Sequence, residues 1–134
     1  MLKYSGVYAA VFTVMLLVDM LWLRVIAVSW YQEGMGPLLA EKPNLWAAAA
    51  FYLLFPLGIV IFAIMLPGNY ATLWQVAAYG ALFGFFAYAT YDLTNLAVVK
   101  NWPLGLSILD MAWGSAVSAL SAAAGKYSLN YFSA

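Results

Sequence analysis

Long apolar runs dominate the chain, and polar side chains interrupt them at only a few places. A helix that crosses the bilayer needs about 20 mostly apolar residues. Four runs meet this requirement, and each is bounded by residue types typical of helix ends and turns. The pattern therefore predicts an all-α integral membrane bundle of four transmembrane helices in a single domain, residues 1–134, with spans at about 6–30, 44–66, 71–99 and 103–125.

The predicted connections are short, with one exception. The second and third spans, and the third and fourth, are joined by turns that fit only antiparallel neighbours. Residues 31–43 form the one longer connection, which we expect to be a loop at the membrane interface. Four spans would place both termini on the same side of the membrane. Each side then carries two lysines outside the spans, so the positive-inside rule does not predict the orientation.

Composition strengthens the membrane assignment and excludes several kinds of site. The chain is 67% hydrophobic and 7% charged, whereas soluble domains have about 25% charged residues. Its net charge is zero and it has no basic patch, which argues against a nucleic-acid partner. Histidine and cysteine are absent, which excludes a Ser-His-Asp triad, a His-ligated haem and the usual zinc sites. We expect the lipid bilayer as partner and no cofactor; a metal held by carboxylates stays open.

Four ionisable residues interrupt the predicted spans: Asp19, Arg24, Asp92 and Asp110. Each costs roughly 2.5–3.5 kcal/mol at mid-membrane, so we expect them to face protein, pair with one another or become neutral. The rise along a helix places all four roughly 9–16 Å inside the same membrane face. Because they come from three different spans, the sequence predicts one convergent polar site.

Small residues favour this convergence. Gly80, Gly84, Tyr88 and Asp92 repeat every four residues, and Gly80-x-x-x-Gly84 is a close-packing motif for membrane helices. On these grounds, the candidates for ligand or ion binding are Asp19, Arg24, Tyr88, Asp92, Asn95 and Asp110.

The first and last spans also share a short motif. Residues 19–22 read Asp-Met-Leu-Trp and residues 110–113 read Asp-Met-Ala-Trp. The two spans run in opposite directions across the membrane, and a repeat of this kind is the pattern expected of an inverted structural repeat.

Several functions fit such a site. One is a proton- or cation-linked transport or binding site, which in a four-helix protein would require a homodimer or larger membrane complex. A second is recognition of a polar ligand or lipid headgroup. A third is an accessory or structural subunit whose polar core only staples the helices together. A lipid-modifying enzyme with paired aspartates is a fourth option, which the absence of histidine makes less attractive, so the sequence does not favour an enzyme.

Five segments together resemble a known family. They are 19–23 (DMLWL), 51–54 (FYLL) with Gly58, 88–97 (YATYDLTNLA), the Trp102-Pro103 pair and 110–114 (DMAWG). In this order and spacing the chain resembles the bacterial membrane family catalogued as domain of unknown function 2177. The resemblance implies a small bacterial inner-membrane protein with four spans and does not imply a reaction. It adds three residues to the candidates, because the shared pattern includes Asp19, Tyr91, Asp92, Thr94, Asn95, Asp110 and Trp113.

Overall fold

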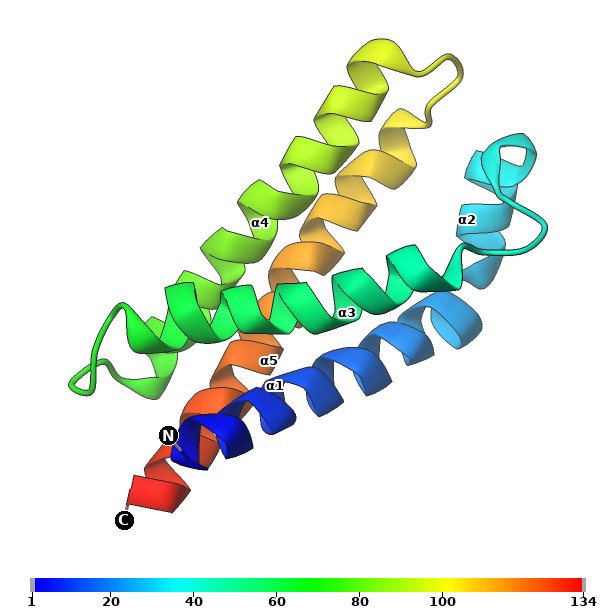
Figure 1. Ribbon diagram of the computed structural model, residues 1–134. Helices are drawn as coiled ribbons and strands as arrows, with labels where there is room; N and C mark the ends of the chain where they lie inside the picture. The colour runs from blue at the N-terminus through cyan, green and yellow to red at the C-terminus, as the bar shows by residue number, and fades with distance from the viewer. Residues whose placement is uncertain (1, 134) are drawn as a thin grey trace.

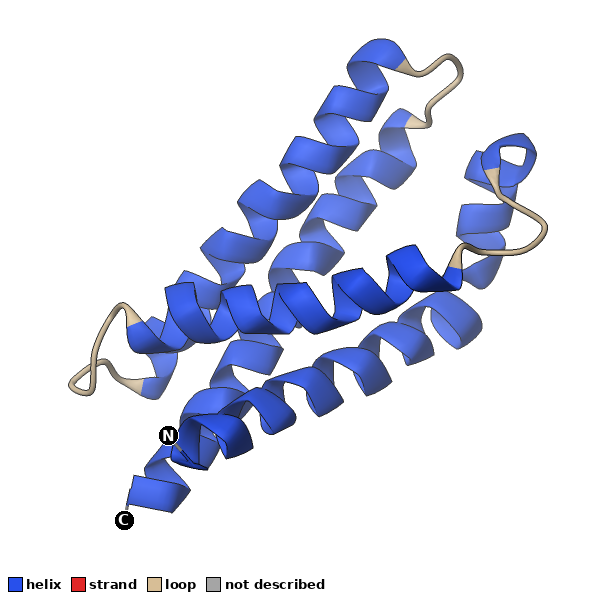
Figure 2. Ribbon diagram, in the orientation of Figure 1, coloured by secondary structure: helices blue, strands red, loops and turns tan. Residues whose placement is uncertain are grey.

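The computed structural model describes residues 2–133, and within this range the chain forms helices joined by turns (Figures 1 and 2). Two α-helices pass directly into π-helical segments, in which the backbone bonds span five residues instead of four. In chain order the elements are α1 (Leu2–Leu21), η1 (Trp22–Ile26), α2 (Val28–Met35), η2 (Gly36–Leu38), α3 (Leu45–Ile59), η3 (Val60–Met65), α4 (Leu73–Val98) and α5 (Leu104–Ser133).

Three of the helical stretches are long and apolar enough to cross a membrane: Leu2–Ile26, Leu45–Met65 and Leu104–Ser133. The 26 residues of α4 are sufficient in length, but they include Gln75, Asp92 and other polar residues and do not meet the apolar requirement. The all-helical class and the membrane-compatible helices are therefore confirmed. The fourth span stays a prediction.

The first predicted span and the predicted loop after it differ from the structure. The helix expected over 6–30 is interrupted at Ala27, where φ is −108° and ψ is 6°. The backbone N–H of Ala27 donates to the oxygen of Trp22 at 2.7 Å, which closes the wide turn of η1. Much of the expected loop 31–43 is then helical, because α2 and η2 occupy it as far as Leu38. The prediction of an irregular loop was wrong for that part.

The last helix is longer than predicted. We expected the last span to end at about Gly125. In the structure α5 continues to Ser133. Gly125 serves close packing instead, because a Cβ there would lie 2.6 Å from side-chain atoms of Ile64 and Val11.

The helices form two pairs that cross. Figure 1 shows α1 beside α3 and α4 beside α5, with the pairs diverging toward the α4–α5 turn. The termini and the turn between η3 and α4 lie together at the opposite end. The α4–α5 contact is close because Gly84 has no Cβ. A Cβ there would collide with the backbone oxygen of Gly114 and the hydroxyl of Ser118. The Gly80-x-x-x-Gly84 motif therefore acts as the packing motif that the sequence predicts.

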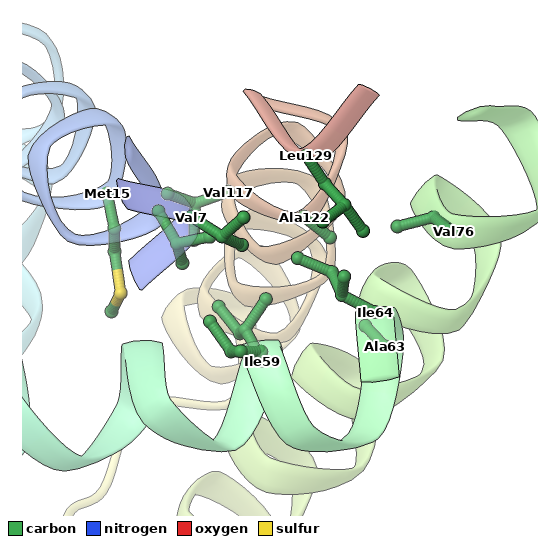
Figure 3. Close-up of a cluster of buried hydrophobic side chains, with 11 residues drawn as sticks. Val7, Met15, Ile59, Ala63, Ile64, Val76, Val117, Ala122 and Leu129 are labelled. Carbon is green, nitrogen blue, oxygen red and sulfur yellow. The ribbon is translucent and has the colours of Figure 1, made fainter. Parts of the chain in front are cut away.

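The apolar core lies toward the end that holds the termini. All four long helices contribute to it, and Figure 3 shows its side chains pointing into the space between them. Large apolar side chains also cover the outside: Leu54, Phe86 and Ile108 are each more than half exposed. Small inward residues with large apolar residues outside are typical of helices packed in lipid. The labelled core residues are Val7, Met15, Ile59, Ala63, Ile64, Val76, Val117, Ala122 and Leu129.

Replacing Gly84 by alanine tests the close packing of α4 against α5. The added methyl group has no room, so we expect Gly84→Ala to destabilise the protein by roughly 1–3 kcal/mol. Thermal unfolding in detergent would measure this as a lower Tm. Gly105→Ala is the matched control, because a Cβ at Gly105 meets nothing within 4 Å. Equal stability of the two variants would contradict the packing described here.

Candidate functional site

Asp19 is a buried carboxylate that ties three helices together. It lies on α1 and its side chain is 5% exposed. Its Oδ1 accepts a hydrogen bond from Nε1 of Trp113 on α5 at 2.8 Å. Its Oδ2 accepts a short hydrogen bond from the hydroxyl of Tyr52 on α3. Both oxygens are thus partnered, as a buried carboxylate requires.

Asp110 on α5 is held by a second chain of hydrogen bonds. The hydroxyl of Tyr31 on α2 donates to Oδ1 of Asp110 at 2.7 Å, and Nε1 of Trp22 donates to the Tyr31 oxygen at 3.3 Å. Burial raises the pKa of Tyr31; the hydrogen bond from Trp22 opposes this shift, and the Asp110 carboxyl adds to it. The phenol therefore keeps its proton and acts as a donor at neutral pH.

The two Asp-Met-x-Trp motifs interlock. The rings of Trp22 and Trp113 stack with their centroids 4.3 Å apart and their planes within 6° of parallel. Trp113 binds the aspartate of the other motif directly, and Trp22 reaches the aspartate of the other motif through Tyr31. The short sequence echo between the first and last helices thus corresponds to a reciprocal contact.

Asp92 differs from the other two aspartates in its partners. It lies on α4 and is only 2% exposed. Its carboxyl lies beside that of Asp110, and both residues line the same small pocket. Among the residues that the structure describes, Oδ2 of Asp92 has no hydrogen-bond partner. Two carboxyl groups can hydrogen-bond to each other only when one of them carries a proton, or they can share a bound cation.

Two pockets adjoin the carboxyls: Asp92 and Asp110 both line the smaller one, whereas Asp19 and Asp110 line the larger one. The smaller, of about 220 Å³, lies where α2, α4 and α5 approach one another and is lined by Tyr31, Asp92, Trp102 and Asp110 among others. The larger, of about 490 Å³, lies between the two helix pairs and has largely aromatic and apolar walls. Asp110 and Tyr91 line both pockets. The pair therefore faces space that a small polar guest could occupy.

Three further candidates on α4 make no direct polar contact with the carboxyls; Tyr88 and Tyr91 line the pockets and Thr94 does not. The ring of Tyr88 packs against Gly114, where any Cβ would collide with it, and lines the larger pocket. Tyr91 is 53% exposed and meets Trp102 edge-on at 5.7 Å. The hydroxyl of Thr94 is exposed and donates within its own helix, to the backbone oxygens of Thr90 and Tyr91.

Arg24 and Asn95 do not join the carboxyls. Arg24 is exposed and makes no ion pair within residues 2–133, and Asn95 is half-buried with no side-chain hydrogen bond in that range. The described residues contain no group of three or more side chains placed to hold a metal ion. The structure therefore brings Asp92 and Asp110 together and gives Asp19 separate partners. The ligand-binding role of all nine candidates stays a prediction.

Two contributors were missing from the sequence analysis. Tyr31 was expected only as the first residue of the interfacial loop, and Tyr52 only as part of the second predicted span, without a polar role. Both hydroxyls instead bind aspartates. The available signal was that a tyrosine hydroxyl within an apolar segment needs a hydrogen-bond partner. What could not be predicted was the irregular backbone at Ala27, which allows α2 to bring Tyr31 back to α5.

A comparison with protein-family models identifies the family to which the chain belongs. Residues 4–127 match the family model described as "Predicted membrane protein (DUF2177)". The chain belongs to the DUF2177 family. This confirms the resemblance that the sequence motifs indicated. No curated protein and no solved structure matches the chain. The DUF2177 match covers Asp19, Asp92 and Asp110, and also the aromatic residues that bind Asp19 and Asp110.

Removing the Tyr52 hydroxyl tests the hydrogen bond that joins α3 to Asp19. We expect Tyr52→Phe to destabilise the protein by about 1–3 kcal/mol, because it leaves an oxygen of a buried carboxylate without its donor. The measurement is the Tm in detergent. In a double-mutant cycle with Asp19→Asn, the two losses should not add. Tyr79→Phe is the control, because the Tyr79 hydroxyl makes no hydrogen bond within residues 2–133. Additive losses would contradict a direct interaction.

Proposed function

We propose that this DUF2177 protein binds a proton or a small cation in the membrane at the Asp92–Asp110 pair. The observation that carries the proposal is the unsatisfied state of Asp92: it is 2% exposed, lies beside a second carboxyl and has one oxygen without a donor among residues 2–133. A buried carboxylate is stable only when it is neutralised, paired or bound to a cation.

The charge balance around the pair supports this assignment. Asp110 receives one hydrogen bond from the neutral hydroxyl of Tyr31, which stabilises a single negative charge. The basic residue that the sequence analysis grouped with the carboxyls, Arg24, is exposed and forms no ion pair within the described chain. A proton shared between the carboxyls, or a cation in its place, supplies the missing positive charge.

The site would function by exchanging a bound proton for a bound cation. A cation entering the pocket of about 220 Å³ would displace the shared proton, and loss of the cation would restore it. Tyr91 and Asp110 line both pockets, which would let the pair communicate with the larger space between the helix pairs. For transport across the bilayer we propose that the working unit is a homodimer or larger complex, because four helices are few to enclose a path.

A proton-release measurement tests the exchange. Purified protein in lipid nanodiscs would be titrated with sodium, potassium or methylammonium chloride while a weakly buffered pH indicator records released protons. We expect saturable release from the wild type and at least about a tenfold weaker response from Asp92→Asn and Asp110→Asn, since a neutral amide carries no exchangeable acid proton.

The matched control is Glu33→Gln, which removes an exposed carboxylate from α2 near the same end of the molecule. It should behave as the wild type. Proton release that persists in Asp92→Asn would overturn the assignment. Absence of release from the wild type, together with unfolding of Asp92→Asn, would favour the alternative that the polar core only staples the helices.

One observation favours a purely structural role for a carboxyl, but it concerns Asp19 and not the Asp92–Asp110 pair. Asp19 has a hydrogen-bond donor on each oxygen, from two other helices, so the protein itself already stabilises its negative charge. We therefore propose that the three carboxyls divide their roles, with Asp19 structural and the Asp92–Asp110 pair functional. The accessory-subunit alternative would require all three to be structural.

We also propose that α4 spans the membrane as a fourth helix, with both termini on the same side of a bacterial inner membrane. Because the chain has no cysteine, single cysteines can report sidedness. Tyr70 precedes α4 and is 100% exposed, and Lys100 follows it and is exposed. In cells, an impermeant maleimide should label Tyr70→Cys and Lys100→Cys from opposite sides. Glu41→Cys should be labelled from the same side of the membrane as Lys100→Cys. Labelling of Tyr70→Cys and Lys100→Cys from one side would contradict a spanning α4.

A further inference from the structure

The charges of this neutral chain are segregated along the bundle. Its five acidic residues are Asp19, Glu33, Glu41, Asp92 and Asp110, and none of them lies in the turn between η3 and α4 or in the terminal parts of α1 and α5. That end of the bundle, where Figure 1 places both termini, contains Lys3 and Lys126. One end of the molecule is therefore basic and has no acidic side chain of its own.

Lys126 is buried at this basic end. Its side chain is 4% exposed, although it carries an ammonium group. Its Nζ donates one long hydrogen bond, 3.4 Å, to the backbone oxygen of Asn69. Within residues 2–133 it forms no ion pair. An ammonium group has three donors, and a buried one without a counter-charge is costly.

A pocket of about 240 Å³ adjoins Lys126. Apart from Leu129, its lining residues are polar or positively charged: Lys3, Asn69, Lys126, Asn130 and Ser133. In the described chain, the side chain of Lys3 interacts with the ring of Tyr4, whose centroid lies 5.5 Å from the Lys3 Nζ. Two ammonium groups, amides and a hydroxyl around one cavity match a compact oxyanion.

The depth of this pocket agrees with a lipid phosphate. Lys126 lies 22 residues after Leu104, the first residue of α5, which is roughly 33 Å along the helix axis. The hydrocarbon core of a bilayer is about 30 Å thick, so the pocket falls at the headgroup level when the start of α5 lies at the opposite interface. Basic pockets between membrane helices bind anionic headgroups at this level.

We propose that the pocket formed by Lys3, Asn69, Lys126 and Asn130 binds a phosphate group. The phosphate belongs to an anionic phospholipid or is free in solution, and the chemistry of recognition is the same for both. This site is independent of the acidic pair, which lies toward the other end of the helices.

The test measures binding by the intact protein in detergent. Phosphatidylglycerol, inorganic phosphate and diacylglycerol, which lacks a phosphate, would be added separately, with Tm and native mass spectrometry as readouts. We expect phosphatidylglycerol to raise the Tm and to form a one-to-one adduct, and diacylglycerol to do neither. An equal effect of inorganic phosphate would identify a free-anion site, and no effect of it would identify the lipid as the source.

Variants make the test specific to the pocket. Lys126→Gln should weaken phosphate or lipid binding at least about tenfold, and Lys126→Arg should retain it because the positive charge remains. Lys3 is exposed, so Lys3→Gln should fold normally. Weaker phosphate or lipid binding by Lys3→Gln would therefore support the site even if Lys126→Gln is unstable. Lys100→Gln, an exposed lysine at the other end, is the matched control. Unchanged binding in Lys3→Gln and Lys126→Gln, or equal stabilisation by diacylglycerol, would overturn the proposal.

Discussion

The need to satisfy one buried carboxylate, Asp19, determines how three of the helices meet. A carboxylate in an apolar bundle must receive hydrogen bonds, and its two donors come from Trp113 on α5 and Tyr52 on α3. These contacts fix the relative depth and rotation of α1, α3 and α5. Because Trp113 also stacks on Trp22, the same contact sets the start of η1, and through it the position of α2.

The bundle consequently has two unlike halves. Toward the termini, aliphatic side chains from all four long helices fill the interior. Toward the α4–α5 turn, the helix pairs diverge and aromatic and carboxyl groups surround pockets. The tight α4–α5 contact at Gly84 lies between these halves. It allows α5 to take part in both, since the same helix presents Asp110 to one half and Lys126 to the other.

Hydrophobic run length was sufficient to predict the helical class and the approximate helix positions, because span length follows from bilayer thickness. The approach of Asp92 to Asp110 could also be predicted, since their depths and the Gly80-x-x-x-Gly84 packing motif both derive from helical periodicity. The break at Ala27 could not be predicted. No glycine or proline marks it, and it depends on tertiary contacts of Trp22 and Tyr31.

Hydrogen-bond accounting separates aspartates that look equivalent in the sequence. Asp19 and Asp92 are similarly buried, at 5% and 2% exposure, and each lies within a helix that the sequence predicts to span the membrane. Asp19 has a donor for each oxygen, so its charge is satisfied by the protein itself. Asp92 has another carboxyl as its neighbour and an oxygen that no described residue satisfies. Asp92 is therefore the carboxyl at which we propose that a proton or a cation binds, and Lys126, buried with one long hydrogen bond, is the ammonium group at which we propose that an anion binds.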